Sequence, residues 1–403
     1  MALEQQQQLE NAYVMPTYAR KPVQFVRGQG MRLYSDTGKE YLDFLAGIGT
    51  ACLGHAHPRL TQAIQHQAAQ LLHVGNYYYI EGRGELAQKI SNLLASGGET
   101  PWKTFFANSG AEASEGAIKL ARKYGLVHLQ GADTIICARG GFHGRTLGAL
   151  AATGQPSKQE YFQPLPPGFT HVDLNDLAEL KAHLGKGIGD KAVCAVMLEC
   201  IQGENGVYPC TDEYLQAVRK LTHEKGILLI IDEVQTGIYR TGTHPFAFQH
   251  AGITPDVVTM AKGLAGGVPI GAFAAQGAAA QVLEPGDHGS TFGGSPLAIA
   301  AANATLDELA AMDAAAHVAT VGAYLQAQLA TLPQVTEVRG RGLMVAMELS
   351  EPVAEQVVAA GLEAGLVLNS IRQHIVRFLP PLICTTQDID VLIVRLKQIL
   401  EQL

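Results

Sequence analysis

The sequence predicts an α/β protein, with a large domain built on a mostly parallel central sheet and a smaller α+β domain. From about residue 60 to 300, helical periods alternate with short β-branched runs, which is the order that parallel sheets produce. Beyond about residue 300, two strand-like runs lie among helical segments. The chain has 403 residues, of which 47% are hydrophobic and 16% charged, so it can bury a large core and form two domains.

The amino-terminal part of the chain is expected to contribute to the smaller domain. It holds three short strand-like runs, PVQFVRG, MRLYSD and KEYLDFLAG, separated by glycine-containing turns. These runs predict a small antiparallel element. We therefore expect the N-terminal segment 1–60 to join the small domain, 61–300 to form the large α/β domain and 301–403 to form the C-terminal small α+β domain.

Four apolar runs supply strands expected of the large domain, namely TIICAR from 134, AVCAVMLE from 192, GILLIIDEV from 226 and DVVTMA from 256. Residues 272–283 fit a further strand followed by a helix. In the last hundred residues, a long alanine-rich helical pattern precedes the strands LMVAMEL and HIVRFLP, and an amphipathic helix follows them.

Charge and composition favour small-molecule partners. The formal net charge of −8 gives no reason to expect nucleic acid or an anionic membrane as a partner. No apolar run is long enough to span a bilayer and the start MALEQQQQLEN lacks a signal-peptide core, so we expect a cytoplasmic protein. The six scattered cysteines form no CxxC pair and are expected to be reduced packing residues. His55 and His57 lack a third ligand at suitable spacing, so no metal site is expected.

Two charged residues follow neighbouring strand-like runs. Asp232 ends one apolar run, and Lys262 ends the next, about one βα unit later. Open α/β sheets place their ligands at the carboxyl ends of strands. Either residue alone could be a helix cap or a loop ion pair. Together, two opposite charges at successive strand ends favour a functional site.

A third candidate is the predicted helix that begins near residue 109. Ser109 and Glu112 have the spacing of a capping box, and the helical period is expected to stop at Gly125. Ser109, Gly110 and Ala111 are small and leave the first backbone N–H groups open, which suits a phosphate. A well-capped surface helix would have the same pattern. Because the chain has no GxxxxGK[ST] segment, the phosphate is not expected to belong to a nucleoside triphosphate.

The loop ARGGFHGRT, from residue 138, offers further groups. Phe142 could stack on a flat cofactor, and the planar fork of Arg145 fits a carboxylate. Phe142 could equally be a core residue, and His143 a loop histidine with ordinary hydrogen bonds.

A lysine, an acid, a phosphate cradle and an aromatic wall are the groups that pyridoxal phosphate needs. These motifs, together with GSTFGGSPLA from 289 and FLPPLICTTQDID from 378, resemble those of the class-III (ornithine-type) pyridoxal-phosphate aminotransferases. The resemblance extends from about residue 16 to the end of the chain. It implies a fold-type-I transferase whose large domain binds pyridoxal 5'-phosphate.

The resemblance also assigns roles around the cofactor ring. Lys262 would attach the cofactor covalently and then act as the base that moves a proton. Asp232 would pair with the pyridinium nitrogen. Val234 and Phe142 would enclose the ring, and Gln235 would lie near its phenolic oxygen.

The same resemblance places the phosphate at Ser109, Gly110 and Ala111. Ser290 and Thr291 would reach the phosphate and substrate of the neighbouring subunit. The family's active unit is therefore expected to be a homodimer with active sites at the subunit interface.

Two arginines are implied as substrate residues. Arg145 would bind the α-carboxylate of an ω-amino donor, and Arg377 that of glutamate. Glu204 would pair with Arg377 while the ω-amino donor is bound, since an unpaired buried charge is costly. A structural ion pair at Arg377 and a plain turn carboxylate at Glu204 are the alternatives.

Within the family, the resemblance is strongest to members that move the δ-amino group of N-acetyl-L-ornithine to 2-oxoglutarate. Ornithine aminotransferases carry a tyrosine where this chain has Ile48, and isoleucine favours an acylated, uncharged nitrogen. Tyr18 aligns with a substrate-side tyrosine. Ala51 and Asn205 replace an asparagine and a glycine that are common in the family, and both could reshape the pocket.

Several alternatives to this activity remain open at the level of sequence. The donor could be succinylornithine, N-succinyl-diaminopimelate, ornithine or 4-aminobutyrate. An aminomutase or decarboxylase would not need the expected pairing of Arg377 with Glu204. A non-catalytic binding protein would not need Lys262 and Asp232.

Overall fold

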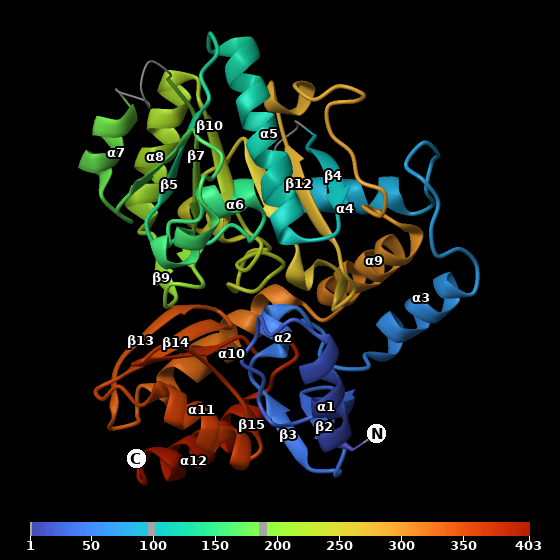
Figure 1. Ribbon diagram of the computed structural model, residues 1–403, viewed down its shortest axis with the longest axis vertical. Coiled ribbons are helices and arrows are strands. Elements are labelled where there is room, and N and C mark those ends of the chain that lie inside the picture. The colour runs from blue at the N-terminus through green and yellow to red at the C-terminus, as the bar shows by residue number, and fades with distance from the viewer. Residues whose placement is uncertain (1, 96–100, 185–191) are drawn as a thin grey trace.

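The computed structural model of the chain describes residues 2–95, 101–184 and 192–403. Within them, the largest sheet has seven strands in the order β4-β12-β11-β10-β7-β5-β6 and occupies the upper part of Figure 1. Its strands are β4 (Lys103–Ala107), β5 (Thr134–Ala138), β6 (Phe169–Val172), β7 (Val193–Glu199), β10 (Leu228–Asp232), β11 (Val257–Met260) and β12 (Gly271–Ala275).

The predicted mostly parallel central sheet is confirmed. The pairs β11–β10, β10–β7, β7–β5 and β5–β6 are parallel, whereas β12 runs antiparallel to β11 and β4. Every residue of β5, β7 and β10 is buried. A sheet buried on both faces needs continuous apolar runs, which explains why these strands show no alternation of polar residues.

Helices cover the seven-stranded sheet on both faces. Alternate residues of one strand point to opposite faces, so Ile230 packs with α5 while Leu229 and Ile231 belong to the core under α4 and α8. The helices of this part are α4 (Arg83–Ala95), α5 (Gly110–His128), α6 (Leu147–Ala152), α7 (Leu177–Leu184), α8 (Asp212–Lys225) and α9 (Pro296–Ala311).

Two four-stranded sheets lie below the large sheet in Figure 1. One has the order β1-β2-β3-β15 and the other β13-β14-β17-β16. Their strands are β1 (Phe25–Gln29), β2 (Arg32–Ser35), β3 (Glu40–Asp43), β13 (Val335–Arg341), β14 (Met344–Leu349), β15 (Leu366–Val367), β16 (Asn369–Arg372) and β17 (Ile375–Phe378). The predicted antiparallel element near the amino terminus is confirmed, and β15 adds to it in parallel with β3.

The remaining elements connect or cover these sheets. The alanine-rich and terminal helical patterns after residue 300 are confirmed as α9, α10 and α12. The bounds not yet given are α1 (Leu3–Tyr13), α2 (Ala46–Gly49), α3 (Pro58–Ala68), β8 (Ile201–Gln202), β9 (Tyr208–Pro209), α10 (Ala314–Leu329), α11 (Ala354–Glu363) and α12 (Thr386–Leu400). In the part of the chain that the structure describes, no helix combines the length and apolar character needed to cross a membrane.

The expected end of a helix at Gly125 is wrong, because α5 continues to His128. Gly125 is required for a close approach instead: a Cβ there would lie 1.9 Å from the carbonyl oxygen of Ala132. Its own carbonyl accepts hydrogen bonds from Leu129 and Gly131. The glycine therefore lets the following turn fold back onto the helix.

The short segment α2 has an unusual backbone. Ala46, Gly47 and Ile48 have φ values of 51°, 61° and 64°. Asp43 holds the start of this left-handed turn, since its Oδ1 accepts hydrogen bonds from the N–H groups of Leu45 and Ala46. A β-branched residue is strained at such φ values, so the surrounding contacts must impose the conformation on Ile48.

Candidate active site

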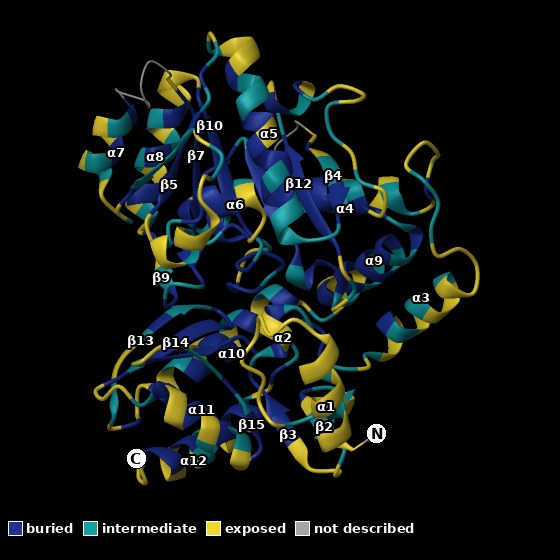
Figure 2. Ribbon diagram, in the orientation of Figure 1, coloured by how far each residue is buried: buried dark blue, intermediate teal, exposed yellow. Residues whose placement is uncertain are grey.

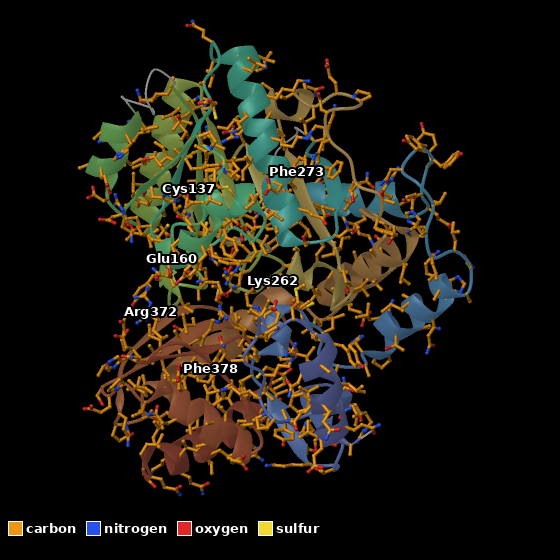
Figure 3. The ribbon with its side chains drawn as sticks, in the orientation of Figure 1. Cys137, Glu160, Lys262, Phe273, Arg372 and Phe378 are labelled. Atoms are coloured by element: carbon orange, nitrogen blue, oxygen red, sulfur yellow. The ribbon has the colours of Figure 1, made fainter. Side chains whose placement is uncertain are left out.

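The candidate site lies at the carboxyl ends of β10 and β11, where the large sheet meets the two smaller ones. Asp232 is the last residue of β10, and Lys262 follows the end of β11 by two residues. Because these strands are parallel neighbours, both side chains reach the same edge of the sheet. Figure 3 shows Lys262 between the part that contains Phe273 and Cys137 and the part that contains Phe378.

Lys262 is half-buried and its backbone has a φ of 43°. Burial lowers the pKa of its ammonium to about 8, the charge of Glu204 opposes this effect, and the charge of Arg377 adds to it. About a tenth of an amine with such a pKa is unprotonated at pH 7 and can act as a base or nucleophile, a far larger share than for an ordinary lysine.

Asp232 is fixed by two hydrogen bonds. Its Oδ1 accepts from the backbone N–H of Val234 at 3.0 Å, and its Oδ2 lies 2.7 Å from Nδ1 of His143. Burial works against a charged imidazole, but the hydrogen bond and charge of Asp232 raise the pKa of His143 above its ordinary value. The two side chains therefore form a buried ion pair, in which His143 holds the carboxylate in place. From the sequence alone, His143 could have been a loop histidine with ordinary hydrogen bonds.

A cavity of about 400 Å³ opens between these residues. The predicted site residues that line it are Ser109, Gly110, Ala111, Phe142, Arg145, Asp232, Val234, Gln235 and Lys262. They come from four separate stretches of the chain, each following a strand of the large sheet.

The start of α5 forms one end of the cavity. The Ser109 hydroxyl caps the helix, accepting from the N–H of Glu112 at 3.2 Å. The reciprocal half of the expected capping box is absent from this end, since the Glu112 carboxylate accepts instead from the backbone and side chain of Asn108. A Cβ on Gly271 would lie 2.0 Å from the Ser109 carbonyl oxygen, so glycine allows β12 to approach the helix start closely. The exposed N–H groups and helix dipole of this end suit a phosphate.

Arg377, on β17, lies opposite Lys262 and is 2% exposed. Its Nη1 donates to Glu204 Oε1 at 2.6 Å, to the Gly203 carbonyl at 3.0 Å and to Gln235 Oε1 at 3.1 Å. Its Nη2 donates to Asn369 at 2.9 Å. Burial alone would raise the pKa of Glu204, but Arg377 holds it below its ordinary value. Arg377 is thus neutralised by Glu204 and joined to the cavity through Gln235.

Glu199 is a cavity residue that sequence reasoning missed. It ends β7 in register with Asp232, and its carboxylate accepts from the N–H of Phe142 at 2.8 Å and of Gly203 at 3.3 Å. Burial raises its pKa to about 7, while His143 lowers it and Asp232 raises it. The only signal in the sequence was its place as an acid after a wholly apolar run, the same signal that identified Asp232.

Four more residues named from the sequence do not line the cavity. Ser290 accepts hydrogen bonds from Asn108 Nδ2 and from the N–H of Gly293, and Thr291 beside it is exposed. Tyr18 is 78% exposed and lines a separate hollow near the amino terminus. Ile48 is 40% exposed on the strained α2 turn.

The residues that line the cavity fit pyridoxal phosphate. They provide an amine of lowered pKa, a carboxylate hydrogen-bonded to an imidazole, an aromatic wall and an open helix start. Gly110 also fits this interpretation. A Cβ there would lie 2.7 Å from Val234 Cγ1 and would narrow the cavity between the start of α5 and Val234. The roles of the individual residues stay predictions.

The chain is similar to known proteins along nearly its whole length. A family model described as Aminotransferase class-III matches residues 13–400. An acetylornithine aminotransferase of Caldanaerobacter subterraneus subsp. tengcongensis is 48% identical over 386 residues, which is 94% of this chain and 95% of that protein. The ornithine aminotransferase of Toxoplasma gondii ME49 superposes with a TM-score of 0.92 at 32% identity, covering 100% of this chain and 96% of the other. The N-acetylornithine aminotransferase of Stenotrophomonas maltophilia K279a gives a TM-score of 0.82 at 34% identity, covering 98% of each chain.

Proposed function

Because the chain belongs to the class-III aminotransferases, which depend on pyridoxal phosphate, we propose that it moves the δ-amino group of N-acetyl-L-ornithine to 2-oxoglutarate. The products would be N-acetyl-L-glutamate 5-semialdehyde and L-glutamate, as in arginine biosynthesis. The observation that carries the proposal is the position of Arg377, a buried arginine that Glu204 neutralises beside the cavity of Lys262. Such an arginine serves an enzyme that must accept glutamate in one half-reaction and a different donor in the other.

Bound pyridoxal phosphate supplies an electron sink that allows an amino group to pass from one substrate to another. In the proposal, the amine of Lys262 removes and returns the proton at the reacting carbon of the substrate. Asp232, held by its hydrogen bond to His143, would pair with the ring nitrogen of the cofactor. Phe142 and Val234 exclude water from the two faces of the ring, and the start of α5 holds the phosphate.

Substrate selection is proposed to depend on two arginines at different distances from Lys262. Arg145 is exposed at the mouth of the cavity, with its guanidinium 5.8 Å from the centre of the Phe142 ring, and would bind the α-carboxylate of the acetylated donor. Arg377 would bind the α-carboxylate of glutamate after Glu204 releases it. Ile48 would face the acylated nitrogen, which needs no charged partner.

A homodimer would complete the site. Tyr77, Tyr79 and Phe292 are exposed aromatic side chains, and Figure 2 shows exposed segments on α3 and in the loop that follows it. Exposed large apolar side chains of this kind support a subunit interface. There, Ser290 and Thr291 would reach the active site of the neighbouring subunit, and Tyr18 the substrate. Light scattering of the purified protein would test the dimer.

We also propose the division of the chain into segments 1–60, 61–300 and 301–403. The pairing of β15 with β3 supports a small domain built from both ends of the chain. The cytoplasmic location stays a prediction.

The test of the proposed function is a donor panel. Steady-state kcat/KM would be measured with N-acetylornithine, ornithine, succinylornithine, N-succinyl-diaminopimelate and 4-aminobutyrate, each with 2-oxoglutarate as the acceptor. We expect N-acetylornithine to rank among the best donors. A clear preference for unacylated ornithine or 4-aminobutyrate would overturn the substrate, and amine chemistry without any 2-oxoacid would overturn the reaction.

A further inference from the structure

A second cavity, of about 720 Å³, lies on the far side of Glu204. Glu204 lines this cavity, while its Oε1 bonds to Arg377 and to Gln235, which lines the first cavity. The side chain of Glu204 is 28% exposed, whereas that of Arg377 is 2% exposed. The carboxylate therefore lies between the two cavities, and the ion pair is exposed toward the second cavity.

Two cations face the second cavity without a carboxylate of their own. Lys158 Nζ donates to the side-chain oxygen of Gln155, and Arg372 Nη2 to that of Asn205. Within residues 2–95, 101–184 and 192–403, neither cation forms an ion pair with an acid. Burial and the nearby Arg145 lower the pKa of Lys158, whereas the charge of Glu204 raises it. The ammonium of Lys158 thus already senses the Glu204 carboxylate.

Asn205 holds Arg372 at the edge of this cavity. Its Nδ2 donates to Gln202 Oε1 at 2.8 Å, and Gln202 in turn donates to the Arg139 carbonyl at 2.8 Å. This leaves the Asn205 side-chain oxygen for the guanidinium of Arg372. Figure 3 shows both Arg372 and Lys262 along the junction between the large sheet and the smaller ones. A glycine at position 205 would offer Arg372 no side-chain oxygen.

The proposed reaction requires Glu204 to leave Arg377. When a substrate carboxylate takes the guanidinium, Glu204 at its present position would be a partly buried anion beside a second anion. Both the lost partner and the like charge disfavour that arrangement. The carboxylate then needs another cationic partner. Of the cations that line the second cavity, Arg139 already pairs with Asp173 and Glu179, which leaves Lys158 and Arg372.

We propose that Lys158 and Arg372 receive the Glu204 carboxylate whenever the carboxylate of glutamate or 2-oxoglutarate occupies Arg377. They are positioning residues for the glutamate half-reaction, since they act on substrate through Glu204 and do not touch it. This inference rests on the proposed function. It adds the second position of the Glu204 carboxylate to that function.

The test compares the two half-reactions of the holoenzyme in single turnovers. In Lys158→Gln, Arg372→Gln and the double variant, we expect kcat/KM for glutamate to fall, by about tenfold in the double variant, which corresponds to ~1.4 kcal/mol. The rate with N-acetylornithine should change by less than about twofold. Lys158→Arg, which keeps the charge, should restore the glutamate rate. Arg139→Gln is the matched control, because Arg139 lines the same cavity but is already paired with Asp173 and Glu179.

A binding measurement gives a readout that does not depend on turnover. Titration calorimetry with glutarate, which offers the carboxylates of glutamate without its amine, should give a Kd about tenfold weaker in the double variant than in the wild type. A crystal structure with glutarate should place a Glu204 oxygen within ion-pair distance of Lys158 or Arg372.

The possible outcomes separate this inference from the proposed function. Unchanged glutamate rates and glutarate affinity in the double variant would overturn the inference. The Glu204 carboxylate would then be solvated by water when it leaves Arg377 and would not need either cation. An equal loss in both half-reactions, or a loss confined to N-acetylornithine, would also overturn it. A wild-type enzyme that reacts with neither substrate would instead overturn the proposed function.

Discussion

Two pairs of an acid and a basic side chain lie at the candidate active site, one lining its cavity and one beside it, and they are held in different ways. Asp232 and His143 are 4% and 1% exposed, and a backbone N–H also binds the carboxylate. Glu204 is 28% exposed, and the other groups that surround it and Arg377 are amides. In the proposed function, the carboxylate that keeps its partner is buried on the large sheet. The carboxylate that exchanges its partner is partly exposed.

The largest expected effect comes from disturbing the fixed pair. Asp232→Asn keeps the shape but removes the charge opposite His143, so the protonated cofactor ring would lose its counter-ion. We expect kcat/KM to fall by about 100- to 1000-fold with every donor. Single-turnover rates with N-acetylornithine and glutamate would measure it, with the surface variant Asp307→Asn as control. A loss limited to one donor would show that Asp232 acts on substrate and not on the cofactor.

Disturbing the exchangeable pair should affect the two donors differently. Glu204→Gln leaves Arg377 unpaired when the acetylated donor presents an apolar methylene, so that half-reaction should slow by about 10- to 100-fold. The glutamate half-reaction should be nearly unchanged, because its own carboxylate neutralises Arg377. Stopped-flow absorbance with each donor separates the two rates. Equal losses would assign the pair a structural role.

The pKa of Lys262 depends on the charges of both pairs, since Glu204 and Asp232 raise it and Arg377 lowers it. Since burial lowers its pKa to about 8, covalent uptake of pyridoxal phosphate by the cofactor-free protein should become about tenfold faster between pH 7 and 9. The charge of Glu204 raises the pKa of Lys262, so Glu204→Gln should shift the midpoint to lower pH. The pH profile of uptake, followed by absorbance, tests both points. A midpoint near 10.5, or one that is higher in Glu204→Gln, would contradict the electrostatics of the site.

The smallest expected effect lies in the strained α2 turn at the edge of the substrate side. Ile48→Gly removes a Cβ from a residue with a φ of 64°, and we expect it to change the free energy of unfolding by about 0.5–1 kcal/mol in the stabilising direction. Denaturant unfolding would measure this change. Ile64→Gly, on the regular helix α3, is the control and should destabilise the protein. Destabilisation at position 48 as well would show that lost contacts outweigh the relieved strain.

The sequence predicted the large sheet and the residues at its carboxyl edge because both leave local signals. Continuous apolar runs mark buried strands, and Asp232 and Lys262 stand directly after two of them. Glu199 also ends an apolar run but was not identified from the sequence. Its carboxylate accepts hydrogen bonds from the backbone N–H groups of Phe142 and Gly203, which lie in other loops.

Other features were not predictable because they depend on contacts between distant segments. Lys158 and Arg372 lie in separate parts of the chain, and only folding brings them to one cavity with Glu204. The helix end beyond Gly125 follows from a turn packing against that glycine, which no local propensity encodes.

The pairing of β15 with β3 has a consequence for how the protein is made. The strand that contains Leu42 cannot acquire its neighbour Leu366 until almost the entire chain has left the ribosome. During translation, the first 60 residues therefore emerge early and wait with an unpaired strand edge while the large sheet assembles. Truncation before residue 366 would leave that edge of β3 uncovered permanently.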